Sequence, residues 1–173
     1  MKLNLSNVVA IAICLVGVAT MFAQKTSYGV KLLTHNVGNK AFSENCSDNP
    51  LYEKMIGLKG RYPEGMRWTN DNRYDWNGGI NSWGTGCLGF AFMLSDAAFD
   101  NLPARKHYDF NNLRVGDILR INNDTHSVII ICINSKTVTL AEGNYNSSIH
   151  WGRTFVKEDI KSKIDYVITR YPE

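Results

Sequence analysis

The sequence predicts an α+β domain in which one long helix is followed by a small antiparallel sheet. In residues 87–99, apolar side chains such as Phe90, Ala91 and Leu94 recur at helical spacing. From residue 118 onward, short apolar runs alternate with polar turns, which is typical of strands joined by hairpins. Because the helix precedes a run of strands and does not alternate with them, an α+β arrangement is favoured over parallel βαβ units.

We expect residues 1–23 to be a signal peptide that is removed on export. Lys2 supplies the positive charge, residues 8–22 are mostly apolar, and Ala23 is a small residue at the cleavage position. A membrane-anchoring helix is the alternative, but the apolar run is shorter than the roughly 20 residues that a span requires. A lipid anchor on Cys14 is disfavoured by the bulky residue before it. The protein is therefore expected to be secreted or periplasmic, without stable membrane insertion.

Residues 24–173 are predicted to form a single domain, because about 150 residues suit one compact core. The whole chain has 19 basic and 16 acidic residues and a net charge of +3. So small a charge does not indicate nucleic-acid binding. There is no internal repeat, low-complexity tract or proline-rich linker, and we expect a monomer.

The first part of this domain, residues 24–82, is polar and rich in scattered aromatic residues. A short helix is expected within residues 49–58, ending before Gly60, and the remainder is expected to be loops. Aromatic side chains in loops either pack over a core or line a groove, and packing is the expectation for most of them.

The later elements follow from apolar runs and the turns between them. Gly84, Thr85 and Gly86 form the turn that starts the helix at residues 87–99, and residues 101–103 end it. A second short helix is expected at residues 157–161. Strands are expected at residues 118–121, 126–133, 137–142 and 164–171. The continuous apolar run of the second strand indicates burial on both faces.

The cysteine count indicates a free thiol. The sequence has four cysteines, and Cys14 leaves with the signal peptide. Cys46, Cys87 and Cys132 remain, so at least one of them is unpaired within a monomer. Such a thiol is either a small buried apolar group or a nucleophile. The sequence leaves open whether Cys46 is exposed or paired.

Cys87 is predicted in the first turn of the helix. The partial positive charge and free N–H groups of a helix N-terminus stabilise a thiolate and lower its pKa. The same N–H groups can form part of an oxyanion hole for acyl transfer. Gly86, without a side chain, would let a carbonyl substrate approach closely. The alternative is a structural cysteine that faces the core with Phe90 and Leu94.

His126 begins a predicted strand, at an edge from which its side chain can face the helix N-terminus. If residues 134–136 form the hairpin turn, Val128 lies opposite Glu142 and His126 opposite Asn144, all on one face. A carboxylate or amide there would orient the imidazole, completing a nucleophile, base and orienting group. A one-residue shift of register would turn Glu142 away.

The same hairpin places Cys132 opposite Val138 and Ile130 opposite Leu140, towards the core. Cys132 lies six positions from His126 on one strand, or roughly 20 Å. This excludes Cys132 as the partner of His126.

No metal site or cofactor is expected. Zinc sites use paired ligands such as Cys-x-x-Cys, which this chain lacks. The four histidines, His35, His107, His126 and His150, are scattered. The glycines around Thr85 are too few for a phosphate loop, and no βαβ unit surrounds them.

Four motifs in order resemble the CHAP and NlpC-type cysteine amidases and peptidases. Residues 86–91, Gly-Cys-Leu-Gly-Phe-Ala, are similar to the nucleophile motif of that family. Residues 115–118 resemble its Gly-Asp turn, and residues 126–130 its histidine strand. Residues 137–144 resemble the strand that ends with its Glu-x-Asn. The resemblance covers residues 83–153, under half of the chain that follows the signal peptide.

The resemblance implies a papain-like fold in which a nucleophile-bearing helix packs on a small antiparallel sheet. It implies that Cys87 attacks an amide carbonyl, that His126 takes the thiol proton and later protonates the leaving amine, and that Glu142 or Asn144 orients His126. The family's usual substrate is peptidoglycan, so the expected partner is a peptide or peptidoglycan.

Some residues depart from the family pattern. The family often has glutamine before the cysteine, whereas this chain has Gly86. The second oxyanion donor is therefore open, with Asn81 and Thr85 as candidates. Trp83, Gly86 and Trp151 are candidate substrate-binding residues, and core packing is the alternative for the two tryptophans. A non-catalytic binding module on the same scaffold and a transglutaminase-like acyltransferase remain alternative functions.

Overall fold

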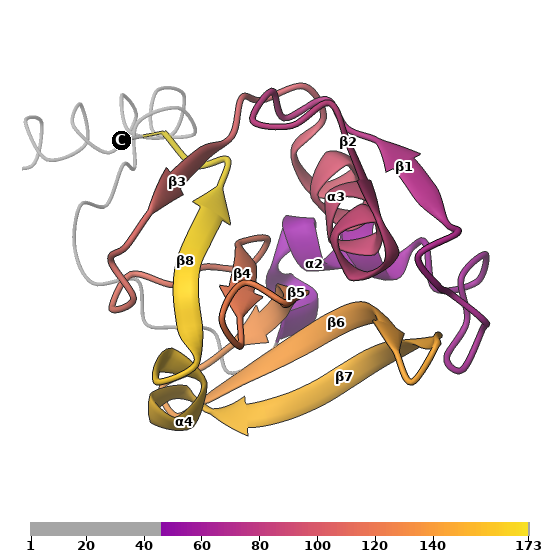
Figure 1. Cartoon of the computed structure of the whole chain (residues 1–173). Coiled ribbons are helices and arrows are strands. Elements are labelled where there is room, and N and C mark those ends of the chain that lie inside the picture. Colours follow the sequence, from indigo (N-terminus) through magenta and orange to yellow (C-terminus); the bar gives the residue numbers. More distant parts are fainter. Residues whose placement is uncertain (1–45, 173) are drawn as a thin grey trace, which may run out of the picture. The chain divides into compact units, whose positions relative to one another are not determined.

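A computed structural model describes residues 46–172, and the expected signal peptide, residues 1–23, lies outside the described residues. The helices and strands follow one another in the order η2 (Cys46–Asp48), α2 (Pro50–Ile56), β1 (Arg73–Asp75), β2 (Trp83–Thr85), α3 (Gly86–Phe99), β3 (Arg105–His107), β4 (Ile118–Ile121), β5 (His126–Ile133), β6 (Thr137–Tyr145), β7 (Ser148–Val156), α4 (Lys157–Lys161) and β8 (Ile164–Thr169) (Figure 1). No helix within residues 46–172 is long and apolar enough to cross a membrane.

The predicted α+β class is confirmed. Six strands form one antiparallel sheet in the order β3-β8-β4-β5-β6-β7, and β1 pairs with β2 in a separate ribbon. The helix α3 packs on β5 and β6 of the large sheet, while α2 and the β1-β2 ribbon pack against α3 from other sides. Figure 1 shows α3 enclosed by these elements.

This enclosure explains why α3 differs from the amphipathic helix that the spacing predicts. Phe92, Met93, Ser95 and Asp96 are buried along with the predicted apolar face. A helix that is covered all round carries no polar stripe. Trp76, from the loop after β1, stacks on Phe92 with ring centroids 3.8 Å apart. The aromatic residues of the N-terminal part thus cover the far side of the helix.

A buried ion pair joins α3 to the end of the chain. Asp96 accepts hydrogen bonds from Arg170 and from the hydroxyl of Tyr74, the latter at 3.0 Å. Arg170 also donates to the carbonyl oxygen of Asp100 at 2.5 Å. Burial raises the pKa of Tyr74 to about 12, with a further contribution from the Asp96 charge. The tyrosine therefore stays a neutral donor.

The Gly-Asp turn before β4 is held by backbone and side-chain bonds. Gly116 has a φ of 90°, which favours glycine, and its N–H donates to Ile130 at 2.7 Å. Asp117 is fully buried and accepts from the Thr169 hydroxyl at 2.5 Å. Burial raises the pKa of Asp117 to about 6, against these hydrogen bonds. The turn thereby fixes β4 between β5 and β8.

The predicted pairing of β5 with β6 is correct in the middle of β5 and wrong next to the turn. Ile130 lies opposite Leu140, as the turn at residues 134–136 predicts. The register then shifts, so that Cys132 lies opposite Thr139 and not opposite Val138. A bulge of this kind adds a residue to one strand and cannot be read from apolar alternation.

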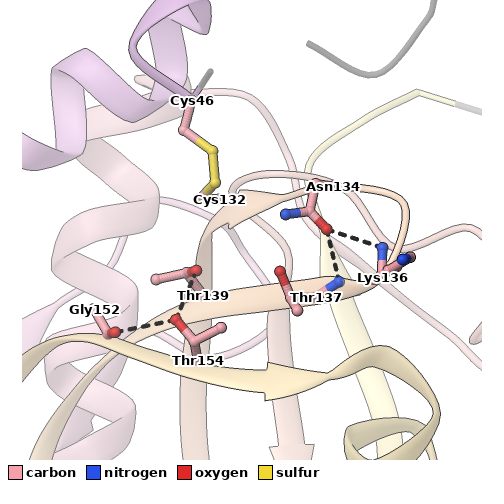
Figure 2. The surroundings of a disulfide bond; sticks show 8 residues. All are labelled: Cys46, Cys132, Asn134, Lys136, Thr137, Thr139, Gly152 and Thr154. Atoms are coloured by element: carbon pink, nitrogen blue, oxygen red, sulfur yellow. Dashed lines mark hydrogen bonds between the residues drawn. A yellow bond between two sulfur atoms is a disulfide. The ribbon is translucent and has the colours of Figure 1, made fainter. Parts of the chain in front are cut away.

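Cys132 forms a disulfide with Cys46, which corrects its assignment to the apolar core and settles the state of Cys46. The two Cα atoms are 5.5 Å apart, a normal separation for a disulfide. Figure 2 shows the bond joining the start of the described chain to β5, close to the turn at Asn134. Cys87 is the free thiol among residues 46–172.

Several expected boundaries are confirmed, and four strands lie outside the predictions. The strands β4 and β5 and both short helices match the expected ranges or fall inside them. The strands β1, β2, β3 and β7 were not predicted, and β2 occupies part of the expected turn at residues 84–86. Each has polar residues on much of its length, so its pairing depends on neighbouring strands and not on its own apolar pattern.

Candidate active site

Cys87 is the second residue of α3 and borders a cavity of about 710 Å³. Gly86, with a φ of 53°, turns the chain from β2 into the helix, a backbone conformation that glycine adopts readily. The thiol is half-buried. The predicted position in the first helical turn is therefore confirmed, and the first N–H groups of the helix have no partner within it.

His126, the first residue of β5, lies against Glu142 of the neighbouring strand β6. Nε2 of His126 and Oε2 of Glu142 are 2.7 Å apart. The carboxylate therefore holds the Nε2 proton and leaves Nδ1 for the thiol of Cys87. Glu142 is 2% exposed, so this hydrogen bond is protected from water. Thiol acyl transfer requires a nucleophile, a base and a group that orients the base, and Cys87, His126 and Glu142 can fill these three roles.

The two reacting groups shift each other's acidity. Burial raises the pKa of the Cys87 thiol, but the hydrogen bond and charge of His126 outweigh burial, and the pKa is lowered. For His126, burial opposes the charged form, yet its bonds to Cys87 and Glu142 raise the pKa to about 9. Both shifts favour a thiolate beside an imidazolium at neutral pH. A nucleophile activated in this way is characteristic of catalytic cysteines.

Arg153 and Arg120 add positive charge around this pair. Arg153, from β7, donates to Oε1 of Glu142 at 2.5 Å, and its guanidinium lies 4.0 Å from the ring centroid of Tyr145. Burial raises the pKa of Glu142, but His126 and Arg153 together lower it. Arg120 borders the cavity, and its charge helps to lower the pKa of Cys87. Glu142 therefore stays ionised and available to His126.

The side chain of Asn144 does not bond to His126 in the structure. It lies just beyond Gly143 with a φ of 59°, and its Nδ2 donates to Oδ1 of Asn70 at 2.8 Å. Of the two candidates for orienting the imidazole, the structure places Glu142 against His126 and Asn144 against a different residue.

Gly86 also has a different role from the predicted one. A Cβ atom at this position would lie 2.2 Å from Oδ1 of Asn70 and 2.9 Å from Nδ2 of Asn144. The space above Gly86 is therefore filled by two amide side chains, and no room remains for a substrate carbonyl there. Its carbonyl oxygen accepts from the indole of Trp68 at 2.8 Å.

The two candidate tryptophans have different surroundings in the structure. Trp83 is 47% exposed, lines the cavity beside Cys87 and has the guanidinium of Arg73 at 4.6 Å from its ring. Trp151 is 9% exposed and packs edge-on against Phe90 in the core. The prediction that Trp151 lines the groove is wrong, because its indole is needed to fill the space between the sheet and α3.

Sequence reasoning missed Asn70, Arg120 and Arg153. Arg153 was missed because β7 was not predicted, although its place opposite Leu140 brings it beside Glu142. Asn70 belongs to a loop whose position depends on tertiary contacts. Among residues 46–172, no group of three or more histidine, cysteine or acidic side chains is arranged to hold a metal.

No family model and no curated protein matches this chain. The crystal structure of Ly7917 is similar with a TM-score of 0.49 at 11% identity, over 69% of this chain and 62% of that chain. The crystal structure of Ly7917 with the hydrolyzing product of MDP gives a TM-score of 0.44 at 12% identity, over 71% of this chain and 66% of that chain. The chain thus spans under two thirds of the length of these structures.

Proposed function

We propose that this chain is an exported cysteine amidohydrolase or peptidase of the CHAP or NlpC type that cleaves an amide bond of peptidoglycan. The observation that carries this proposal is the chain of interactions from Glu142 through His126 to Cys87, whose thiol borders a cavity. A structural cysteine would need neither a base beside its thiol nor a buried carboxylate behind that base.

The arrangement supports a thioester mechanism. The Cys87 thiolate attacks the carbonyl carbon, and the carbonyl electron pair moves to oxygen. When the tetrahedral intermediate collapses, the C–N bond breaks and the imidazolium of His126 gives its proton to the leaving amine. Water then attacks the thioester while His126 removes its proton, and the C–S bond breaks to release the acid. The thiolate and the imidazolium are thereby restored.

The lining of the cavity suits a polar substrate that is neutral or acidic. Its lining includes the amide of Asn81, the hydroxyl of Ser82, the guanidinium of Arg120 and the indole of Trp83. No carboxylate belongs to the described lining. Peptidoglycan peptides carry free carboxylates and amides, which such a surface can bind.

The disulfide supports the proposed export. Structural disulfides persist in oxidising compartments and are rare in the cytosol. The bond between Cys46 and Cys132 therefore agrees with the expected signal peptide. A retained free thiol in the same chain then calls for a functional reason, and nucleophilic catalysis supplies one.

The test is digestion of purified peptidoglycan by the chain without residues 1–23, with fragments identified by mass spectrometry. We expect new amine and acid ends from this protein and none from Cys87→Ala or His126→Ala. His150→Gln is the matched control, since His150 bonds to Glu64 and not to Cys87. Full cleavage by Cys87→Ala would refute the proposal. Fragments joined to an added primary amine would instead identify an acyltransferase, and binding without cleavage would identify a binding module.

A further inference from the structure

Gly86, the residue before the nucleophile, is hydrogen-bonded to one loop through both its carbonyl and its N–H. The indole of Trp68 donates to the Gly86 carbonyl at 2.8 Å, and the Gly86 N–H donates to the carbonyl of Asn72 at 3.0 Å. Asn70 lies between these two contacts in the chain. The loop, residues 68–72, is therefore fixed relative to Cys87, although it belongs to the N-terminal part that the family resemblance does not cover.

The side chain of Asn70 is exposed, and one hydrogen bond orients it. Its Oδ1 accepts from Nδ2 of Asn144 at 2.8 Å, and it lies so close to Gly86 that only a glycine fits there. This bond occupies the amide oxygen. The amide nitrogen of Asn70 has no hydrogen-bond partner in the part of the chain that the structure describes, residues 46–172. Asn70 lines the same cavity as Cys87.

We propose that the side-chain amide of Asn70 donates a hydrogen bond to the oxyanion formed when Cys87 attacks, with the Cys87 backbone N–H as the second donor. Asn144 is a positioning residue, because its bond occupies Oδ1 of Asn70 and leaves the amide nitrogen as the free donor of a side chain that lines the cavity. This inference rests on the proposed function, since it assigns a role within the same reaction.

The proposal replaces the two candidates that the sequence offered. Thr85 is the N-cap of α3, and its side chain makes no capping bond, so nothing fixes its hydroxyl. Asn81 and Asn70 are both exposed residues of the cavity lining, but no hydrogen bond in the described chain orients Asn81. A preorganised donor is worth more than a mobile one, because its orientation costs nothing during the reaction. Asn70 meets this condition through its contacts with Gly86 and Asn144.

The experiment compares substrate turnover with alkylation of the same thiol. Iodoacetamide reacts with Cys87 without forming an oxyanion, whereas amide cleavage requires one. For Asn70→Ala we expect kcat for peptidoglycan peptides to fall about 10²- to 10³-fold, with KM and the alkylation rate within about twofold of the original protein. Asn70→Asp, similar in shape but without the donor, is expected to lose as much. Asn144→Ala is expected to lose roughly tenfold, as a positioning residue would.

Asn112→Ala, which removes an exposed amide outside the cavity, is the matched control and is expected to keep full turnover. The inference is overturned if Asn70→Ala keeps its kcat within about threefold, or if alkylation and turnover fall in parallel, which would indicate a purely structural role. Loss of the proposed function is distinguishable from either result. In that case the original protein and Cys87→Ala would cleave equally, and the oxyanion role would fall with the reaction itself.

Discussion

Replacement of Glu142 by glutamine tests whether the carboxylate behind His126 controls the reactivity of Cys87. The glutamine keeps the shape of the side chain but removes the charge that lies 2.7 Å from Nε2 of His126. Without that charge the imidazolium is less stable, and so is the thiolate that pairs with it. We expect the pKa of His126 to fall and the pKa of Cys87 to rise.

The size of the effect follows from the shift at His126. Its pKa rises from 6.5 to about 9. A shift of this size corresponds to roughly 3 kcal/mol of preference for the charged form, at about 1.4 kcal/mol per pKa unit. Cys87 and Glu142 share this stabilisation, so the carboxylate accounts for about 1 to 2 kcal/mol. We therefore expect a fall of about one pKa unit at His126 and a loss of roughly 5- to 30-fold in kcat/KM.

The assay is the pH dependence of Cys87 alkylation and of kcat/KM. In the original protein, we expect the alkylation rate to rise with pH at a pH below 9.0, the ordinary pKa of a thiol. We expect kcat/KM to decline at higher pH, as His126 loses its proton with a pKa of about 9. In Glu142→Gln, we expect the acid limb of alkylation to move up and the alkaline limb of kcat/KM to move down, each by about one unit.

Glu64→Gln is the matched control, because it removes a carboxylate 2.8 Å from a different histidine, His150. It is expected to leave both limbs in place. Unchanged limbs in Glu142→Gln, or equal shifts in the two variants, would refute the view that Glu142 acts on Cys87 through His126.

Three further predictions concern the framework around the site. Replacing Cys46 and Cys132 together by serine is expected to cost about 2–5 kcal/mol of unfolding free energy in urea titrations. Thiol titration of the unreduced chain without residues 1–23 should find one thiol, and two or more would contradict the disulfide. Asp96→Ala leaves the buried Arg170 without its carboxylate partner, so we expect a loss of about 3–5 kcal/mol of unfolding free energy in the same titration. Asp75→Ala, at an exposed ion pair, is the control and should lose less than about 1 kcal/mol. Equal losses in the two variants would argue against the buried pair. Trp151→Ala is expected to lose about 3–5 kcal/mol of stability, while Trp83→Ala should raise KM and leave the unfolding midpoint unchanged; the reverse pattern would exchange their roles.

The sequence by itself determined the elements whose apolar pattern matches their burial. The strand β5 lies inside the core, so its continuous apolar run identifies both its type and its limits, and β4 is identified by the apolar residues on either side of Arg120. The two glycines before Cys87 mark the turn into α3, and the polar turns mark the ends of the strands. Cys87 and His126 were accessible to prediction because each stands at the start of such an element, whereas Glu142 lies within β6 and was one of two candidates, with Asn144, for orienting His126.

Only the tertiary structure decided which side chains meet across distant segments. The bulge in β5 changed the partner of Cys132, and proximity in three dimensions paired it with Cys46. Likewise, Asn144 faces Asn70 and not His126, because the loop at residues 68–72 docks on Gly86. Such contacts join residues far apart in the chain, and no local periodicity records them. The physical reason is that a periodic pattern reports only whether a side chain is buried, whereas its partners depend on how separately formed elements pack together.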